Sequence, residues 1–106
     1  MNTPKIVVLS WDRELAKLIA IMLSRLSFDF QVVYDIWSVD EDFNGILIYR
    51  FSSSSPVTME HVVKYTPMAS IIFIKQELDG TEPDNALVLT LPFTFVQLKQ
   101  MIERAI

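Results

Sequence analysis

Short apolar runs alternate with longer amphipathic stretches along the whole chain of 106 residues. Each run is rich in β-branched residues and too short for a helix, so it predicts a buried strand. The five expected strands cover residues 5–10, 29–34, 45–50, 69–75 and 86–91. No two neighbouring runs are joined by a two-residue turn, so hairpins are not expected. Strands that are apolar on both faces are typical of a parallel sheet covered by helices on both sides.

The first three spaces between strands differ in the helix they can hold. After the first strand, Asp12 is a suitable N-cap for a long helix. The apolar face of this helix comprises Leu15, Leu18, Ile19, Met22, Leu23 and Leu26. Residues 35–44 have room for about two helical turns. After the third strand, the Ser55–Pro56 pair predicts a helix start, and Pro67 predicts an end near Tyr65.

The last space between strands predicts an irregular loop, and the segment after the fifth strand predicts a well-capped helix. Residues 76–85 contain a glycine, a proline and four acids, which favours a loop where the alternation would place a helix. Thr94 and Gln97 have the spacing of a capping box, and Phe93 can pack on Leu98 as a hydrophobic staple. The apolar face of this last helix comprises Phe95, Leu98, Met101, Ile102 and Ala105. One helix of the alternating pattern is therefore expected to be missing.

Composition excludes several functional classes. The net charge is −4 without a basic patch, which disfavours direct nucleic-acid binding. The chain has no cysteine, so disulfides and thiolate metal sites are excluded. No apolar run approaches the roughly 20 residues of a membrane span, and no signal-peptide pattern is present, so we expect a cytoplasmic protein. Eight of the thirteen acids fall in residues 35–42 and 77–84, either as two solvated loops or as an acidic surface for a basic partner.

The end of the chain carries a resemblance to a known family. Residues 90–94, Thr-Leu-Pro-Phe-Thr, precede an amphipathic helix. This resembles the receiver domain of bacterial response regulators, in which a fifth strand ends in Lys-Pro-Phe. Residues 45–50 resemble the third strand of that family, and the resemblance extends over the whole chain. It implies a flavodoxin-like α/β sandwich with strand order 2-1-3-4-5, the first and last helices on one face, and a cis Leu91–Pro92 bond.

The chain departs from this family at the positions that carry its chemistry. A working receiver has two acids that hold Mg²⁺, an aspartate that accepts the phosphoryl group, a threonine or serine, and a lysine. The corresponding positions here are Ser10, Trp11, Arg50, Lys75 and Leu91, and the aromatic switch position is Val88. Mg²⁺ prefers carboxylate oxygens, and an arginine is not a nucleophile. We therefore expect a degenerate receiver without Mg²⁺, phosphoryl transfer or another cofactor.

Two interpretations remain for Arg50 and Lys75, which should end adjacent strands. They could form a salt bridge with Asp12 in place of the metal site, or an anion pocket for a phosphate or nucleotide. Trp11 and Phe51 are expected at the same edge, where they would fill the vacated acidic pocket. His61 is the only histidine, and no cysteine or paired carboxylate lies near it in the sequence, so no metal site is predicted.

The sequence contains no acid–base or nucleophile constellation, which argues against an enzyme. It favours a phosphorylation-independent signalling module that binds a protein partner or a second copy through its fifth strand and last helix. The expected interaction residues are Val88, Phe95, Met101 and, as an exposed aromatic, Trp37. The alternative is a sensor of a small anionic ligand at Arg50 and Lys75. The chain ends in amphipathic register, so we expect the N-terminal part of a longer regulator, such as a transcription regulator.

Overall fold

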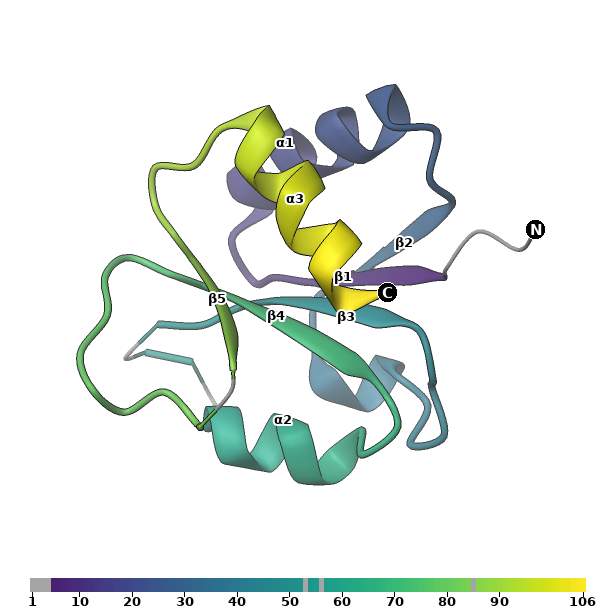
Figure 1. Cartoon of the computed structure of the whole chain (residues 1–106). Coiled ribbons are helices and arrows are strands. Elements are labelled where there is room, and N and C mark those ends of the chain that lie inside the picture. Colours follow the sequence, from purple (N-terminus) through teal and green to yellow (C-terminus); the bar gives the residue numbers. More distant parts are fainter. Residues whose placement is uncertain (1–4, 53, 56, 85) are drawn as a thin grey trace.

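A five-stranded parallel sheet runs through the middle of the molecule (Figure 1). The computed structural model describes residues 5–52, 54–55, 57–84 and 86–106. The strands are β1 Ile6–Leu9, β2 Phe30–Val33, β3 Ile46–Arg50, β4 Ser70–Lys75 and β5 Leu87–Thr90. Their order is β2-β1-β3-β4-β5, and every neighbouring pair is parallel. The predicted fold class and strand order are confirmed.

Helices cover both faces of this sheet (Figure 1). They are α1 Arg13–Arg25, the 3₁₀ turn η1 Ile36–Ser38, α2 Met59–Tyr65 and α3 Phe95–Ala105. Successive residues of a strand point to opposite faces, so one strand feeds two separate cores. In β3, Ile46 and Ile48 pack in the core under α1 and α3, whereas Leu47 and Tyr49 pack in the core under η1 and α2. The predicted division of helices between the two faces is confirmed.

Side chains close the N-terminal ends of the two long helices. The Asp12 carboxylate accepts a hydrogen bond from the Leu15 backbone N–H at 3.2 Å. At α3, Gln97 N–H donates to Thr94 Oγ1 at 3.1 Å, and Thr94 N–H donates to Gln97 Oε1 at 2.8 Å. This is the predicted capping box, which satisfies backbone donors that have no partner within the helix. The Leu91–Pro92 peptide bond is cis, as expected.

Two predictions about the helices are wrong in detail. Helix α2 begins at Met59 with Thr58 as its cap, three residues later than predicted, and Thr58 Oγ1 accepts from His61 N–H at 3.1 Å. Ser55 Oγ instead accepts from Ser52 N–H at 2.9 Å, and Pro56 lies outside the described residues. In α1, Leu18 points to solvent. The small side chain of Ala16 takes a buried position on that helix instead.

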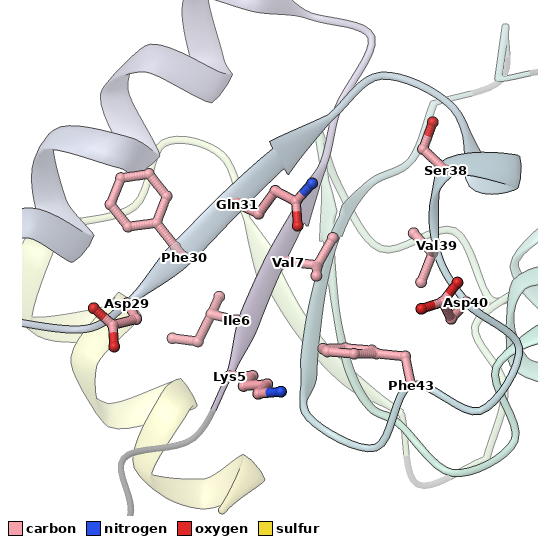
Figure 2. A pocket seen from close by; sticks show the side chains of 10 residues that line it. All are labelled: Lys5, Ile6, Val7, Asp29, Phe30, Gln31, Ser38, Val39, Asp40 and Phe43. Atoms are coloured by element: carbon pink, nitrogen blue, oxygen red, sulfur yellow. The ribbon is translucent and has the colours of Figure 1, made fainter.

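The helical layer over β1 and β2 is thin because η1 is a single turn, shorter than the two turns predicted. A groove of about 300 Å³ remains there, with Val7 between Gln31 on one side and Phe43 on the other (Figure 2). Phe43 also packs closely over Gly45. A Cβ atom at Gly45 would lie 2.7 Å from the Phe43 ring and 2.3 Å from the Lys5 carbonyl oxygen, so only glycine fits.

The segment between β4 and β5 contains no helix among its described residues, 76–84 and 86. The predicted absence of a helix here is confirmed for these residues, and β5 forms an edge of the sheet. Within the described residues, no helix combines the length and the apolar character needed to cross a membrane.

Candidate functional site at the carboxyl edge of the sheet

The ends of β1, β3, β4 and β5 meet at one edge of the sheet because the strands are parallel. This carboxyl edge contains all five degenerate positions, which are Ser10, Trp11, Arg50, Lys75 and Leu91. The five positions therefore lie at the edge of the sheet that was predicted from the sequence. The environments of the five side chains differ, however, and they do not form one site.

The loop after β1 uses its polar groups internally. Ser10 is buried, its hydroxyl donates to the Asp12 carbonyl at 2.9 Å, and the same hydroxyl accepts from Asp12 N–H at 3.1 Å. The Asp12 carboxylate caps α1. Trp11 lies between them with 48% of its surface exposed. This loop offers hydroxyl and indole groups where a receiver would offer carboxylates, so it is a poor binding site for Mg²⁺.

Arg50 lies on the α1 and α3 side of the sheet. Its register partner in β4 is Ile74, which belongs to the core on that side. Only 8% of Arg50 is exposed. Its Nη1 donates to the Ile74 carbonyl at 3.3 Å and to the Phe51 carbonyl. Its buried Nε has no acceptor within the described residues. The expected ion pair between Arg50 and Asp12 is wrong, because the Asp12 carboxylate is engaged at the helix cap.

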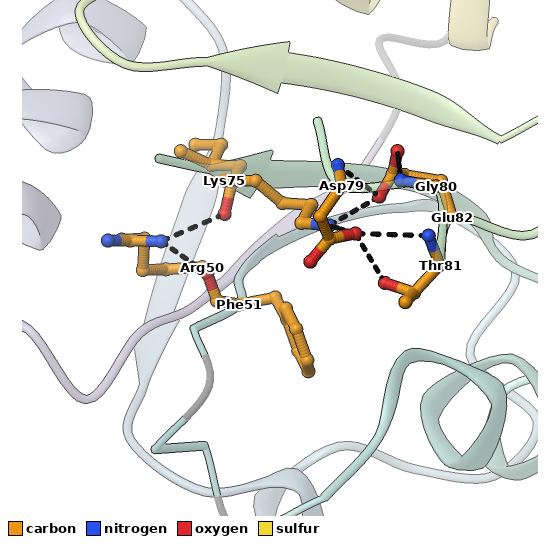
Figure 3. Close-up of polar contacts among 8 residues, drawn as sticks. Arg50, Phe51, Lys75, Asp79, Gly80, Thr81 and Glu82 are labelled. Carbon is orange, nitrogen blue, oxygen red and sulfur yellow. Dashed lines mark hydrogen bonds and ion pairs between the residues drawn. The ribbon is translucent and has the colours of Figure 1, made fainter. Parts of the chain in front are cut away.

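Lys75 follows Ile74 and therefore points to the opposite face, toward α2 (Figure 3). Its Nζ forms ion pairs with Asp79, at 2.7 Å, and with Glu82. It also lies 5.7 Å from the centre of the Phe51 ring. The predicted joint basic pocket of Arg50 and Lys75 is wrong, since the two charges leave the sheet on opposite sides and Lys75 is already neutralised.

The Lys75 cluster is electrostatically self-contained. Burial lowers the pKa of Lys75, but hydrogen bonds and charges from Asp79 and Glu82 raise it by more, so the net shift is upward. The hydrogen bond from Lys75 lowers the pKa of Asp79, and the Thr81 hydroxyl, at 2.6 Å, lowers it further. Lys75 and Asp79 therefore each favour the charged form of the other. Lys75 ties the loop of residues 79–82 to β4.

Leu91 is half-buried and packs against the core under α1 and α3. Its side chain offers no charge where a receiver has its lysine. Its backbone N–H donates a hydrogen bond to the Lys75 carbonyl, at the end of β4, at 2.9 Å. His61 is exposed, with its ring edge-on to Trp37 at 5.9 Å. Across the described residues, no group of three or more His, Cys, Asp or Glu side chains could hold a metal ion.

The expected interaction residues fall in two places. Val88, Phe95 and Met101 lie at β5 and α3, where all three are half-buried. Val88 and Met101 line a groove of about 270 Å³ beside the edge strand. Trp37 lies on η1, is 67% exposed, and packs edge-on against Tyr65 at 5.5 Å. The partners of Lys75, Asp79 and Glu82, were not predicted, although Asp79 lies four residues after Lys75 in the sequence, a spacing that suggests an ion pair.

We predict that Lys75→Met destabilises the protein by about 1 kcal/mol, because it removes the cation between two acids, one of which, Asp79, is half exposed to solvent. Adding Asp79→Asn and Glu82→Gln to this variant should restore most of the loss, since no unpaired charge then remains. Urea unfolding at pH 7 measures both effects. Asp79→Asn with Glu82→Gln alone is the control and should be less stable than the triple variant. A Lys75→Met variant as stable as the wild type would show that the cluster does not hold the loop.

Comparison with known proteins gives structural similarity without sequence similarity. Neither a family model nor a curated protein matches the sequence. A response regulator receiver protein from Sinorhizobium medicae is similar in structure, with 15% identity, a TM-score of 0.79, and coverage of 98% of this chain and 94% of that one. The signal receiver domain of a modulated diguanylate cyclase from Desulfovibrio desulfuricans has 19% identity, a TM-score of 0.80 and the same coverage.

A chemotaxis protein from Vibrio cholerae has 13% identity and a TM-score of 0.78, with coverage of 99% of this chain and 100% of that one. At this level of identity, the shared property is the fold. The similarity extends over nearly the whole chain, as the Pro-Phe signature and the strand order suggested. The chain has the fold of a response-regulator receiver domain.

Proposed function

We propose that this chain is a signalling module that binds a protein partner independently of phosphorylation. The observation that carries the proposal is the state of the carboxyl edge. Where a receiver has acids, an acceptor aspartate and a free lysine, this chain has Ser10, Trp11, a buried Arg50, a neutralised Lys75 and Leu91.

The chemistry of these side chains argues against phosphoryl transfer at this edge. An arginine stays protonated and cannot attack phosphorus. The charge that develops on the transferred group must be offset by a metal ion and a lysine. Leu91 has no charge to offer, and the Lys75 charge is already paired with two carboxylates. The receiver fold is therefore used here without the receiver reaction.

We predict that acetyl phosphate with Mg²⁺ leaves both the mass and the backbone NMR spectrum of the protein unchanged, because no acceptor carboxylate lies at the end of β3. Mass spectrometry and two-dimensional NMR measure this, with a working receiver domain treated in parallel as the control. A gain of one phosphate that is lost on mild alkaline treatment would show that the chain still accepts phosphoryl groups.

The proposed partner surface is the free edge of β5 together with the flank of α3. β5 pairs with β4 on one side only, and an unpaired strand edge can accept a further strand. A groove of about 270 Å³ lies on the α3 side, and Thr90 and Gln100 are among its lining residues. A second groove, of about 320 Å³, includes Val63, Ile71 and Leu87 in its lining. Pro83 and Asp84, from the loop before β5, also line this second groove.

We predict that the protein forms a dimer through this surface at high concentration. Thr90→Lys with Gln100→Lys should shift the dimer toward monomer, because a two-fold interface would bring the added charges together. Both side chains are exposed, so the fold should persist. Light scattering at increasing concentration measures the effect.

The matched control for this experiment is Ser24→Lys with Asn44→Lys, which adds the same charge at exposed positions outside β5, α3 and the two grooves. It should dimerise like the wild type. A wild-type protein that stays monomeric at 1 mM would show that self-association through β5 is wrong, and a different protein would then be the partner for this surface.

A second candidate function is the binding of a small anion at Arg50. The observation that favours it is the buried guanidinium, whose Nε has no acceptor in the described part of the chain and whose other bonds go only to carbonyl oxygens. A buried cation without a carboxylate is costly, and an anion would relieve that cost. This site would use Arg50 alone, since Lys75 lies on the other face.

For this second candidate, we predict that inorganic phosphate raises the melting temperature of the wild type and not that of Arg50→Gln. Each tenfold excess of ligand over Kd adds about 1.4 kcal/mol of stability, so a thermal scan in 1 to 50 mM phosphate detects the binding. Chloride at equal ionic strength is the control. Equal shifts in both proteins would assign the effect to salt and remove this candidate.

A further inference from the structure

An apolar cavity lies at the carboxyl edge between β1 and β3, where the sheet order reverses direction. Its volume is about 90 Å³. Leu9 at the end of β1, Tyr49 near the end of β3 and Ile36 of η1 line it, and all three are buried. In open α/β sheets, the crevice at this switch point is where ligands bind. Here it is lined mainly by apolar side chains.

Three exposed aromatic residues surround this cavity. Trp11, Tyr34 and Trp37 line it while keeping 48%, 50% and 67% of their surfaces exposed. Neighbouring side chains hold two of them in place. Trp37 packs edge-on against Tyr65, and the Arg13 guanidinium lies 4.8 Å from the centre of the Tyr34 ring. Large aromatic side chains that are already ordered lose little entropy on binding, and such residues often dominate the energy of protein interfaces.

The surface that runs from the cavity past η1 is acidic. Asp35 lines the cavity directly, Asp40 lines the groove of Figure 2, and Glu41 and Asp42 follow as exposed residues. No lysine or arginine occurs between Asp35 and Tyr49. Arg13 lies at the border of the cavity, over the ring of Tyr34. Asp35 uses one oxygen to accept from Ser38 N–H at 3.0 Å, as the cap of η1. A binding partner at this place should therefore carry positive charge.

We infer that this cavity binds one aliphatic side chain of a short basic segment from a partner protein. A cavity of about 150 Å³ holds benzene, so one of about 90 Å³ suits a leucine-sized or smaller group. The acids extend along the chain from the cavity, which fits a segment with lysine or arginine beside the aliphatic residue better than it fits a single small cation. The inference rests on the proposed protein-binding function for the class of partner, but it uses a surface distinct from β5.

A random nine-residue peptide library displayed on phage, selected against the wild-type domain, tests this inference. The enriched peptides should share one leucine, isoleucine or methionine with at least two lysines or arginines nearby. A synthetic copy of the most enriched peptide is then titrated while tryptophan fluorescence is followed. Replacing its aliphatic residue by alanine should weaken binding about tenfold or more, and raising the salt concentration should weaken it further.

Two variants of the domain address the cavity and its charge separately. Trp37→Ala should weaken binding about tenfold or more, and Glu41→Lys with Asp42→Lys should abolish the salt dependence and most of the binding. The controls are Leu78→Ala, which removes an exposed apolar residue elsewhere, and Glu77→Lys with Glu103→Lys, which matches the change in charge. Both controls should bind like the wild type. Melting curves verify that every variant is folded.

Several results would overturn the inference. One is a set of enriched peptides without the aliphatic and basic pattern. Another is peptide binding as strong as that of the wild type by Trp37→Ala or by Glu41→Lys with Asp42→Lys. A third is a fluorescence response to leucinamide at the same concentration as to the peptide. The last result would assign the cavity to a small molecule. Thr90→Lys with Gln100→Lys should bind the peptide normally, so failure at this cavity and failure at the β5 surface can be told apart.

Discussion

The register between β3 and β4 is the constraint on which the rest of the carboxyl edge depends. It pairs Arg50 with Ile74, so Arg50 shares a face with Ile74, and Lys75 points the other way. Two cations that end adjacent strands are thereby separated by the sheet itself. Each must find its own environment, Arg50 among backbone carbonyls and Lys75 between two acids. A shift of one residue in this pairing would place Arg50 beside Lys75 on one face and turn the apolar side chains of one strand away from their cores, which makes the register strongly specified.

The Lys75 cluster links this edge to the loop that precedes β5. A buried ion pair adds little net stability, because removing its charges from water costs about as much as their attraction returns. The ion pairs of Lys75 instead fix one arrangement of the loop of residues 79–82. By holding Asp79 and Glu82 against the end of β4, Lys75 keeps the loop compact at the carboxyl edge. The strand that follows this loop, β5, keeps a free edge with a groove on each side.

Much of the fold could be predicted from the sequence, because strands and long helices follow from short-range periodicity. The Thr94–Gln97 box and the Asp12 cap depend on residues three apart, so local spacing was enough to find them. The start of α2 was misplaced because Ser55 and Pro56 satisfy a local rule, while the buried positions of Met59 and Val62 select Thr58 as the cap.

The candidate site was less predictable because it depends on pairing between strands. The sequence shows which residues end β3 and β4, but it does not show which residue of β4 lies beside Arg50. Without that register, Arg50 and Lys75 could not be assigned to opposite faces, and Asp12 was wrongly chosen as their shared partner. The aromatic cavity also escaped prediction, since its lining comes from three loops, two strands and η1, which only the fold brings together.

The replacements at the carboxyl edge change what kind of recognition this place can perform. In a working receiver, carboxylates around a metal ion recognise one charged group, the phosphoryl group that is transferred at that point. Trp11, Tyr34 and the apolar cavity that they line offer shape and apolar area instead. Such recognition needs no metal and no covalent step, and its strength depends on how well a partner fills the cavity. The same switch point that positions reactive groups in a receiver-like sheet can therefore position a binding surface, without any change in strand order.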